Sequence, residues 1–167
     1  MSLLSFQQDD VLFAQDLPPR VNSHLQQAVV LYQDTERAEQ SLWKAHALAP
    51  DRLEVYIALY KFYFYKGRLA DAERVAYLAL DVAAELGGFS ANWNELDDSS
   101  AIWMPAQGAP RFFMYTLKAL AFIRLRRNDA NMAREILAKI QQLDPEDQVG
   151  ASVIADLALG LGEEGHG

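Results

Sequence analysis

Side chains that could catalyse a reaction or hold a metal ion are few in this sequence and are far apart. The three histidines are His24, His46 and His166, and none has a second histidine four residues away, as a helical metal-binding pair requires. The acidic run at 95–98 lacks the spacing and the glycine of a calcium-binding loop. There is no cysteine, glycine-rich phosphate loop or Ser-His-Asp pattern. We therefore expect no catalytic residue, no metal site and no cofactor, and a protein that is not an enzyme.

Aromatic and cationic side chains, in contrast, recur at helical spacing in two segments. In 53–65, at 3.6 residues per turn, one face carries Tyr56, Leu59, Tyr60 and Tyr63, and we expect this face to pack in the core. The other face offers apolar, aromatic and cationic contacts from Ile57, Lys61, Phe64 and Tyr65. The matching face of 111–127 carries Tyr115, Lys118, Phe122 and Arg126. Such faces suit an acidic and apolar segment of another protein.

These two helices belong to an internal repeat. Residues 34 apart fall on one another when the first two copies are aligned: Leu25 on Leu59, Val29 on Tyr63, Ala38 on Ala72, Leu42 on Ala76, and Ala45 on Ala79. A third copy matches the second at an offset of 61: Leu59 with Leu120, Tyr60 with Ala121, Gly67 with Asn128, Ala72 with Ala133, and Val75 with Ile136. Because the offset is constant across both helices of the third copy, the extra residues must all lie between copies two and three.

The chain resembles the tetratricopeptide-repeat family from about residue 19 to residue 147. The resemblance rests on the 34-residue period, the small residues at Ala38, Ala72 and Ala133, the turn "YKGRLADAE", and the endings "LAPD" and "LDPED". It implies an all-α, right-handed solenoid of helical hairpins. It also implies that the first helix of each repeat lines a concave groove, which would contain the two aromatic and cationic faces.

The expected organisation follows from these repeats and from local signals. We predict one domain over 19–161, with repeats at about 19–52, 53–86 and 114–147, an insertion at 87–113 and a capping helix at 147–161. Pro19 and either Asp34 or Thr35 suit helix starts, and Asp51 with Glu54 forms a capping-box pattern. Residues 1–18 form an arm or an extra helix that covers the first repeat, enters the groove or exchanges between protomers. Residues 162–167 are expected to be a disordered tail.

The insertion holds two of the three tryptophans, Trp93 and Trp103. Structureless loops of this length are uncommon in compact domains. We predict a short helix capped by Ser90 or Asn92, with both indoles packed onto the helices at 69–86 and 111–127. A binding surface for a partner or a second copy, formed by the same two tryptophans, is the less favoured alternative.

Composition narrows the class of partner. The net charge of −8 disfavours nucleic acid and anionic membranes, because both attract basic proteins. Residues 1–13 lack the positive region of a secretory signal, so we expect a cytoplasmic protein. The favoured function is an adaptor or small chaperone that binds a peptide or helix of a partner protein in its groove. The alternative is a self-associating subunit, such as a homodimer, whose groove is filled by its own arm or last helix.

Overall fold

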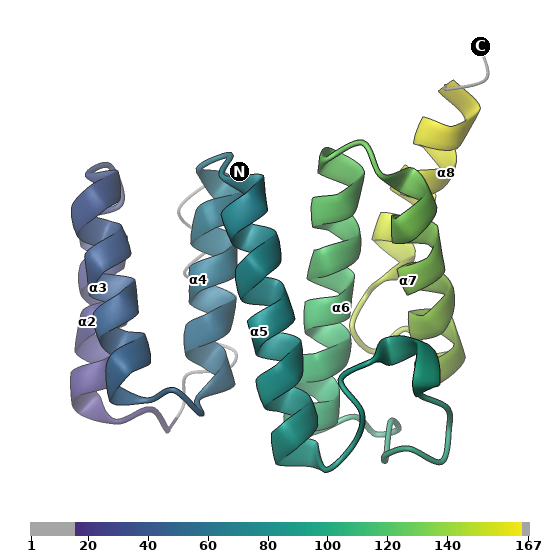
Figure 1. Ribbon diagram of the computed structural model, residues 1–167, viewed down its shortest axis with the longest axis horizontal. Coiled ribbons are helices and arrows are strands. Elements are labelled where there is room, and N and C mark those ends of the chain that lie inside the picture. Colours follow the sequence, from purple (N-terminus) through teal and green to yellow (C-terminus); the bar gives the residue numbers. More distant parts are fainter. Residues whose placement is uncertain (1–15, 165–167) are drawn as a thin grey trace. The chain divides into compact units, whose positions relative to one another are not determined.

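The computed structural model describes residues 16–164, with side chains up to Gly160. Within this range the chain is all-α, as predicted, and has no β-strand. The helices are α2 (Pro19–Val30), α3 (Thr35–Leu48), α4 (Leu53–Tyr65), α5 (Leu69–Gly87), α6 (Gly108–Arg126), α7 (Ala130–Leu143) and α8 (Ser152–Glu164), with a short 3-10 helix η1 (Trp93–Glu95) (Figure 1). Most of the predicted arm and the last part of the predicted tail lie outside the described residues.

The chain divides into two compact units, one ending at Val75 and the other beginning at Ala76. This boundary falls within α5. In the first unit, α3 packs against both α2 and α4. Pro19 lies in the first turn of α2, and the Asp34 side chain caps α3 by accepting a hydrogen bond from the backbone N–H of Arg37 at 3.3 Å. These two helix starts were predicted correctly.

In the second unit, α7 packs against α6, α8 and η1, and α8 also contacts α6. Helix α6 begins at Gly108, before the predicted start near 111, so the segment between α5 and α6 is shorter than the predicted insertion. Helix α8 begins later than predicted. Asp147 (φ 56°) and Gly150 (φ 73°) have left-handed backbone conformations, which no α-helix can contain, so residues 144–151 form a loop.

The turns after α4 and α6 are closed by the same hydrogen bonds, 61 residues apart. After α4, Lys66, Gly67 and Arg68 donate to Phe62, Phe64 and Tyr63 at 3.0, 3.0 and 2.9 Å. After α6, Arg127, Asn128 and Asp129 donate to Ile123, Leu125 and Arg124 at 3.0, 3.1 and 2.9 Å. Gly67 and Asn128 both have positive φ, 75° and 65°. Asparagine is among the residues that tolerate this conformation best after glycine, which explains how one turn serves two sequences.

The turn after α2 closes differently. Gln33 occupies the position that corresponds to Gly67, and a glutamine rarely adopts positive φ. Tyr32 instead donates to Val29 at 3.3 Å, and Asp34 donates to Leu31 at 2.8 Å. The small residues of the three predicted copies are nevertheless alike in burial, because Ala38, Ala72 and Ala133 are all 0% exposed.

Candidate protein-interaction surfaces

Helix α4 is buried along almost its whole length. The predicted core face is confirmed, since Tyr56, Leu59, Tyr60 and Tyr63 are at most 4% exposed. The opposite face is not uniformly open, because Ile57 is 1% exposed and Lys61 is 8% exposed. Ile57 therefore belongs to the core, which is the general fate of a helix that is hydrophobic all round. The aromatic residues of the last turn are only half-buried.

Phe64 and Tyr65 form the partly exposed end of α4. Their rings meet edge to face, with centroids 5.8 Å apart. The turn that follows is held by the three backbone hydrogen bonds described above, so the backbone carrying these rings is well defined. Rigid aromatic side chains of this kind present a large contact area at a low cost in conformational entropy.

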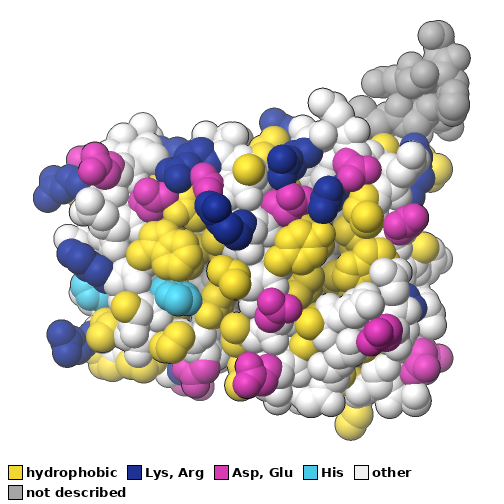
Figure 2. Space-filling model, viewed as in Figure 1, with side chains coloured by type: hydrophobic (Ala, Val, Ile, Leu, Met, Phe, Trp, Pro, Cys, Tyr) yellow, Lys and Arg dark blue, Asp and Glu magenta, His cyan; other side chains and the backbone are white. Residues whose placement is uncertain are grey.

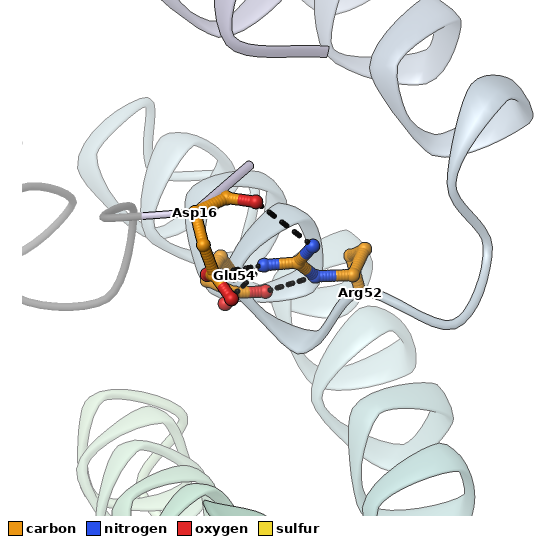
Figure 3. A network of polar contacts seen from close by, with 3 residues as sticks. All are labelled: Asp16, Arg52 and Glu54. Atoms are coloured by element: carbon orange, nitrogen blue, oxygen red, sulfur yellow. Dashed lines mark hydrogen bonds and ion pairs between the residues drawn. The ribbon is translucent and has the colours of Figure 1, made fainter. Parts of the chain in front are cut away.

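The start of α4 is organised by Arg52 rather than by the predicted capping box (Figure 3). The Arg52 guanidinium donates to both carboxylate oxygens of Glu54, at 3.3 and 3.1 Å, and to the Asp16 carboxylate at 2.9 Å. No side-chain hydrogen bond caps the helix. The capping box required the Glu54 carboxylate, which instead accepts a bidentate pair of hydrogen bonds from the guanidinium. The result is a tie between Asp16, just before α2, and the first turn of α4.

Four aromatic side chains form a hydrogen-bonded cluster between α3 and α4. The Trp43 indole N–H donates to the Tyr63 hydroxyl at 2.8 Å. The Tyr56 hydroxyl donates to the Pro50 carbonyl at 2.6 Å, and it also lies 3.1 Å from His46 Nε2. Because that hydroxyl uses its proton on Pro50, we assign the proton of the second bond to His46 Nε2. Burial lowers the pKa of His46, in agreement with a neutral, structural histidine.

A second tie joins turns that are 34 residues apart. The Lys66 ammonium donates to the Tyr32 carbonyl at 2.6 Å and lies 3.9 Å from the centroid of the Tyr32 ring. The same ring meets Phe62 edge to face at 6.0 Å. The turn after α4 is therefore bound directly to the corresponding turn after α2. Nothing in the residue types had predicted this pairing, although its separation equals the repeat period.

Part of the predicted binding face of α6 makes contacts within the fold. Tyr115, Lys118 and Phe122 are half-buried, and Arg126 is exposed. The Lys118 ammonium lies 4.6 Å from the centroid of the Tyr115 ring, so the predicted aromatic and cationic pair forms. However, the same ammonium donates to the Val149 carbonyl at 2.8 Å and so fixes the loop between α7 and α8.

The two tryptophans of the insertion are buried, as favoured from the sequence. Trp93 is 9% exposed and Trp103 is 4% exposed. Trp103 packs against Phe113 of α6, as predicted, and against Phe89, with ring centroids 6.4 and 5.2 Å away. The short helix η1 was also predicted, and of the two expected caps, Ser90 and Asn92, Asn92 is the one used; its contact with α7 was not expected. These indoles therefore support the fold.

Polar bonds hold the insertion against the second unit. The Gln148 amide donates to the Trp103 carbonyl and accepts from the Ala106 N–H, both at 2.8 Å. Lys139 of α7 donates to the Leu96 carbonyl at 2.7 Å. The apolar side chains that the insertion does expose are Ile102, at 75%, and Met104, at 44%.

Two surface hollows were missed by the sequence analysis. One, of about 380 Å³, lies on α3 and is lined by Glu39, Gln40, Trp43, Lys44 and Ala47, which follow helical spacing. The other lies between α7 and α8. Figure 2 shows apolar side chains at the surface among basic and acidic ones.

Among the described residues, no group of acidic, histidine or cysteine side chains could hold a metal ion. No helix of the described range is long and apolar enough to cross a membrane.

Comparison with known proteins places the chain beside one curated relative. No family model matches the sequence, and no solved structure matches it. The sequence is 31% identical over 159 residues to the uncharacterized 19.8 kDa protein in nifW 5'region of Azotobacter chroococcum mcd 1. The match covers 94% of this chain and 88% of the relative. The chain therefore belongs to the same family as that Azotobacter protein.

Proposed function

We propose that this chain is a non-catalytic protein-interaction module, an adaptor or small chaperone, with a tetratricopeptide-like helical array. Its binding surface is the partly exposed end of α4, formed by Phe64 and Tyr65. The partner contributes a peptide or helix with apolar and acidic side chains.

Three structural details support a tetratricopeptide-like array. The turns after α4 and α6 have matching hydrogen bonds, the three alanines are completely buried, and Lys66 binds Tyr32 at a separation of 34 residues. Each is what stacked copies of one helical hairpin require, because a small residue permits close helix packing and corresponding turns become neighbours.

The observation that carries the binding proposal is the edge-to-face pair of Phe64 and Tyr65, which is half-buried at the end of a helix that is otherwise largely covered. Aromatic anchors contribute most of the affinity in many protein interfaces. The Azotobacter relative is named for the nifW 5' region. Products of the genes beside this chain's own gene are therefore the first partners to test.

The test compares three tagged baits: the wild type, the double variant Phe64→Ala/Tyr65→Ala, and Val30→Ala. Val30 is 83% exposed in the same unit, so it controls for loss of a surface apolar side chain. Circular dichroism and thermal unfolding first establish that all three baits are folded. We expect a partner, identified by mass spectrometry and then confirmed with purified protein, that binds the wild type and Val30→Ala but not the double variant. A partner that binds all three equally contradicts the proposed surface.

Self-association is the second candidate, and one observation favours it. Helix α8 exposes Val153 at 62% and Leu157 at 47%, whereas a terminal helix of a solenoid normally has a polar outer face. Sedimentation velocity over a range of concentrations tests this candidate. A dimer that Leu157→Lys dissociates supports self-association through α8, and a monomer at all concentrations argues against it.

A further inference from the structure

The groove between α7 and α8 combines an apolar floor with an acidic rim. Its volume is about 290 Å³, which is just below the usual range for small-molecule pockets and suits a side chain better than a drug-sized ligand. The floor is formed by Leu137 and Ile140 of α7 and Ala155 of α8. Carboxylates line the same groove at Asp144, Asp147 and Asp156.

The apolar surface continues along α8 beyond the groove. Leu159 follows Ala155 by four residues, so the two side chains lie on one face of the helix. Leu159 is 63% exposed. A segment lying on this face could therefore place an apolar side chain on Leu159 while another side chain enters the groove.

Two of the carboxylates are fixed in place by hydrogen bonds. Asp144 is 3% exposed and accepts from the Gln148 N–H and side-chain amide at 2.9 and 3.0 Å, and from the Val149 N–H at 3.1 Å. Asp147 accepts from the Ser152 hydroxyl and N–H at 2.6 and 3.1 Å. These bonds from Ser152 lower the pKa of Asp147, so it is ionised at neutral pH.

The rim has little opposing positive charge. No lysine or arginine lines the groove. Lys118 does not line the groove, but its ammonium, which donates to the Val149 carbonyl, keeps its charge and acts on Asp147 electrostatically. Arg134 of α7 donates to the Ala158 carbonyl at 3.5 Å. Asp156 is exposed on α8 and lines the groove. The groove therefore presents apolar surface together with an excess of negative charge.

We propose that this groove receives a lysine or arginine side chain from a basic, amphipathic segment of a partner protein. The aliphatic stem of that side chain packs on Leu137, Ile140 and Ala155, and its charged end meets Asp147 and Asp156. Charge argues against the other occupants. Residues 1–15 contain Asp9 and Asp10 and no lysine or arginine, and a second copy of the chain carries a net charge of −8.

This inference goes beyond the proposed function, because it concerns a different surface, a different unit and a partner segment of opposite charge. Its failure would leave the Phe64 and Tyr65 surface untouched. The variant Phe64→Ala/Tyr65→Ala is expected to bind the probe described below as the wild type does.

The test measures fluorescence anisotropy with a labelled amphipathic peptide of leucine and lysine at physiological ionic strength. Four proteins are compared: the wild type, Asp156→Asn, Asp81→Asn and Ala155→Phe. Asp81 is exposed on α5 and does not line the groove, so Asp81→Asn is matched in charge to Asp156→Asn. Circular dichroism confirms the folding of each variant. A peptide with glutamate in place of lysine is the ligand control.

We expect Asp156→Asn to weaken peptide binding about threefold to fivefold relative to Asp81→Asn, as for a partly exposed ion pair. Ala155→Phe fills the groove and should weaken binding about tenfold or more. Equal affinities for the two asparagine variants, unchanged binding by folded Ala155→Phe, or equal binding of the glutamate peptide would each overturn the proposal. A dimer of the wild type that Ala155→Phe dissociates would overturn it in favour of a second copy in the groove.

Discussion

Helices α4 and α8 have similarly apolar sequences but opposite fates. In α4, every residue from Val55 to Tyr63 is buried, including Lys61. In α8, Ile154 and Ala158 are buried, but Val153, Leu157 and Leu159 are 47–63% exposed. Among the described elements, helix α8 has substantial contacts only with α6 and α7, and it is the last helix of the described range. The apolar content of a helix therefore indicates that burial would stabilise it. The neighbouring elements decide how much of its surface is buried.

The largest expected effect comes from making the same substitution, leucine to alanine, in both helices. Leu59→Ala in α4 removes a side chain that is 0% exposed and should lower the free energy of unfolding by about 3 kcal/mol. Leu157→Ala in α8 removes one that is 47% exposed and should change it by no more than about 0.5 kcal/mol. Urea unfolding of both variants provides the measurement. Equal losses would show that the exposed face of α8 is covered in solution.

A pH titration tests the burial of α4 in a second way, because the Tyr63 hydroxyl of this helix is buried. Burial, followed by a hydrogen bond with Glu39, raises the pKa of Tyr63 to about 12 from 10.0. Between these pH values the unfolded chain loses the phenol proton while the folded chain keeps it. The contribution of the Tyr63 phenol to the free energy of unfolding is therefore fully present below pH 10 and is lost as the pH rises to 12. This loss is no more than about 2 kcal/mol.

The control for this prediction is Tyr63→Phe, which keeps the ring but cannot ionise. Burial also raises the pKa of Tyr56, so part of the alkaline destabilisation should remain in the variant. Stability is measured by urea unfolding at several pH values from neutral to alkaline. If the wild type and Tyr63→Phe lose stability with the same dependence on pH, Tyr63 does not titrate as proposed.

The smallest effects come from two glycines, one in the turn after α4 and one within α8. Gly67, after α4, has a φ of 75°, so Gly67→Ala should destabilise the protein by about 1 kcal/mol. Gly160 lies within α8, and an added Cβ would meet no atom within 4 Å. Gly160→Ala should therefore raise stability, by up to about 1 kcal/mol, through its better helix propensity. Thermal unfolding checks both signs, and a loss of stability in Gly160→Ala would contradict the description of α8 as open.

Much of the architecture could be predicted because it depends on local chemistry. Pro19 and Asp34 suit helix starts because of the unpaired backbone N–H groups in the first turn of each helix. The match between Gly67 and Asn128 was visible because both residues tolerate positive φ. Ala38, Ala72 and Ala133 were aligned from the sequence and are all 0% exposed, as expected of small residues at close helix contacts.

The predicted binding face of α4 was less accurate. Residue types placed Ile57 and Lys61 beside Phe64 and Tyr65, yet Ile57 lies in the core. Helical spacing gives the face of a residue and not what covers it. The groove between α7 and α8 was missed for a related reason, since its acidic rim is assembled from a loop and a helix whose relative position no periodicity specifies.

The sequence by itself determined the all-α class and the starts of helices such as α2 and α3. These features follow from local backbone preferences and from side-chain type. Only the tertiary structure decided that Arg52 binds both Asp16 and Glu54, that Gln148 ties the insertion to the second unit, and that Lys118 holds a loop. Each of these long side chains can reach many partners, and packing alone selects which of them lies within hydrogen-bonding distance.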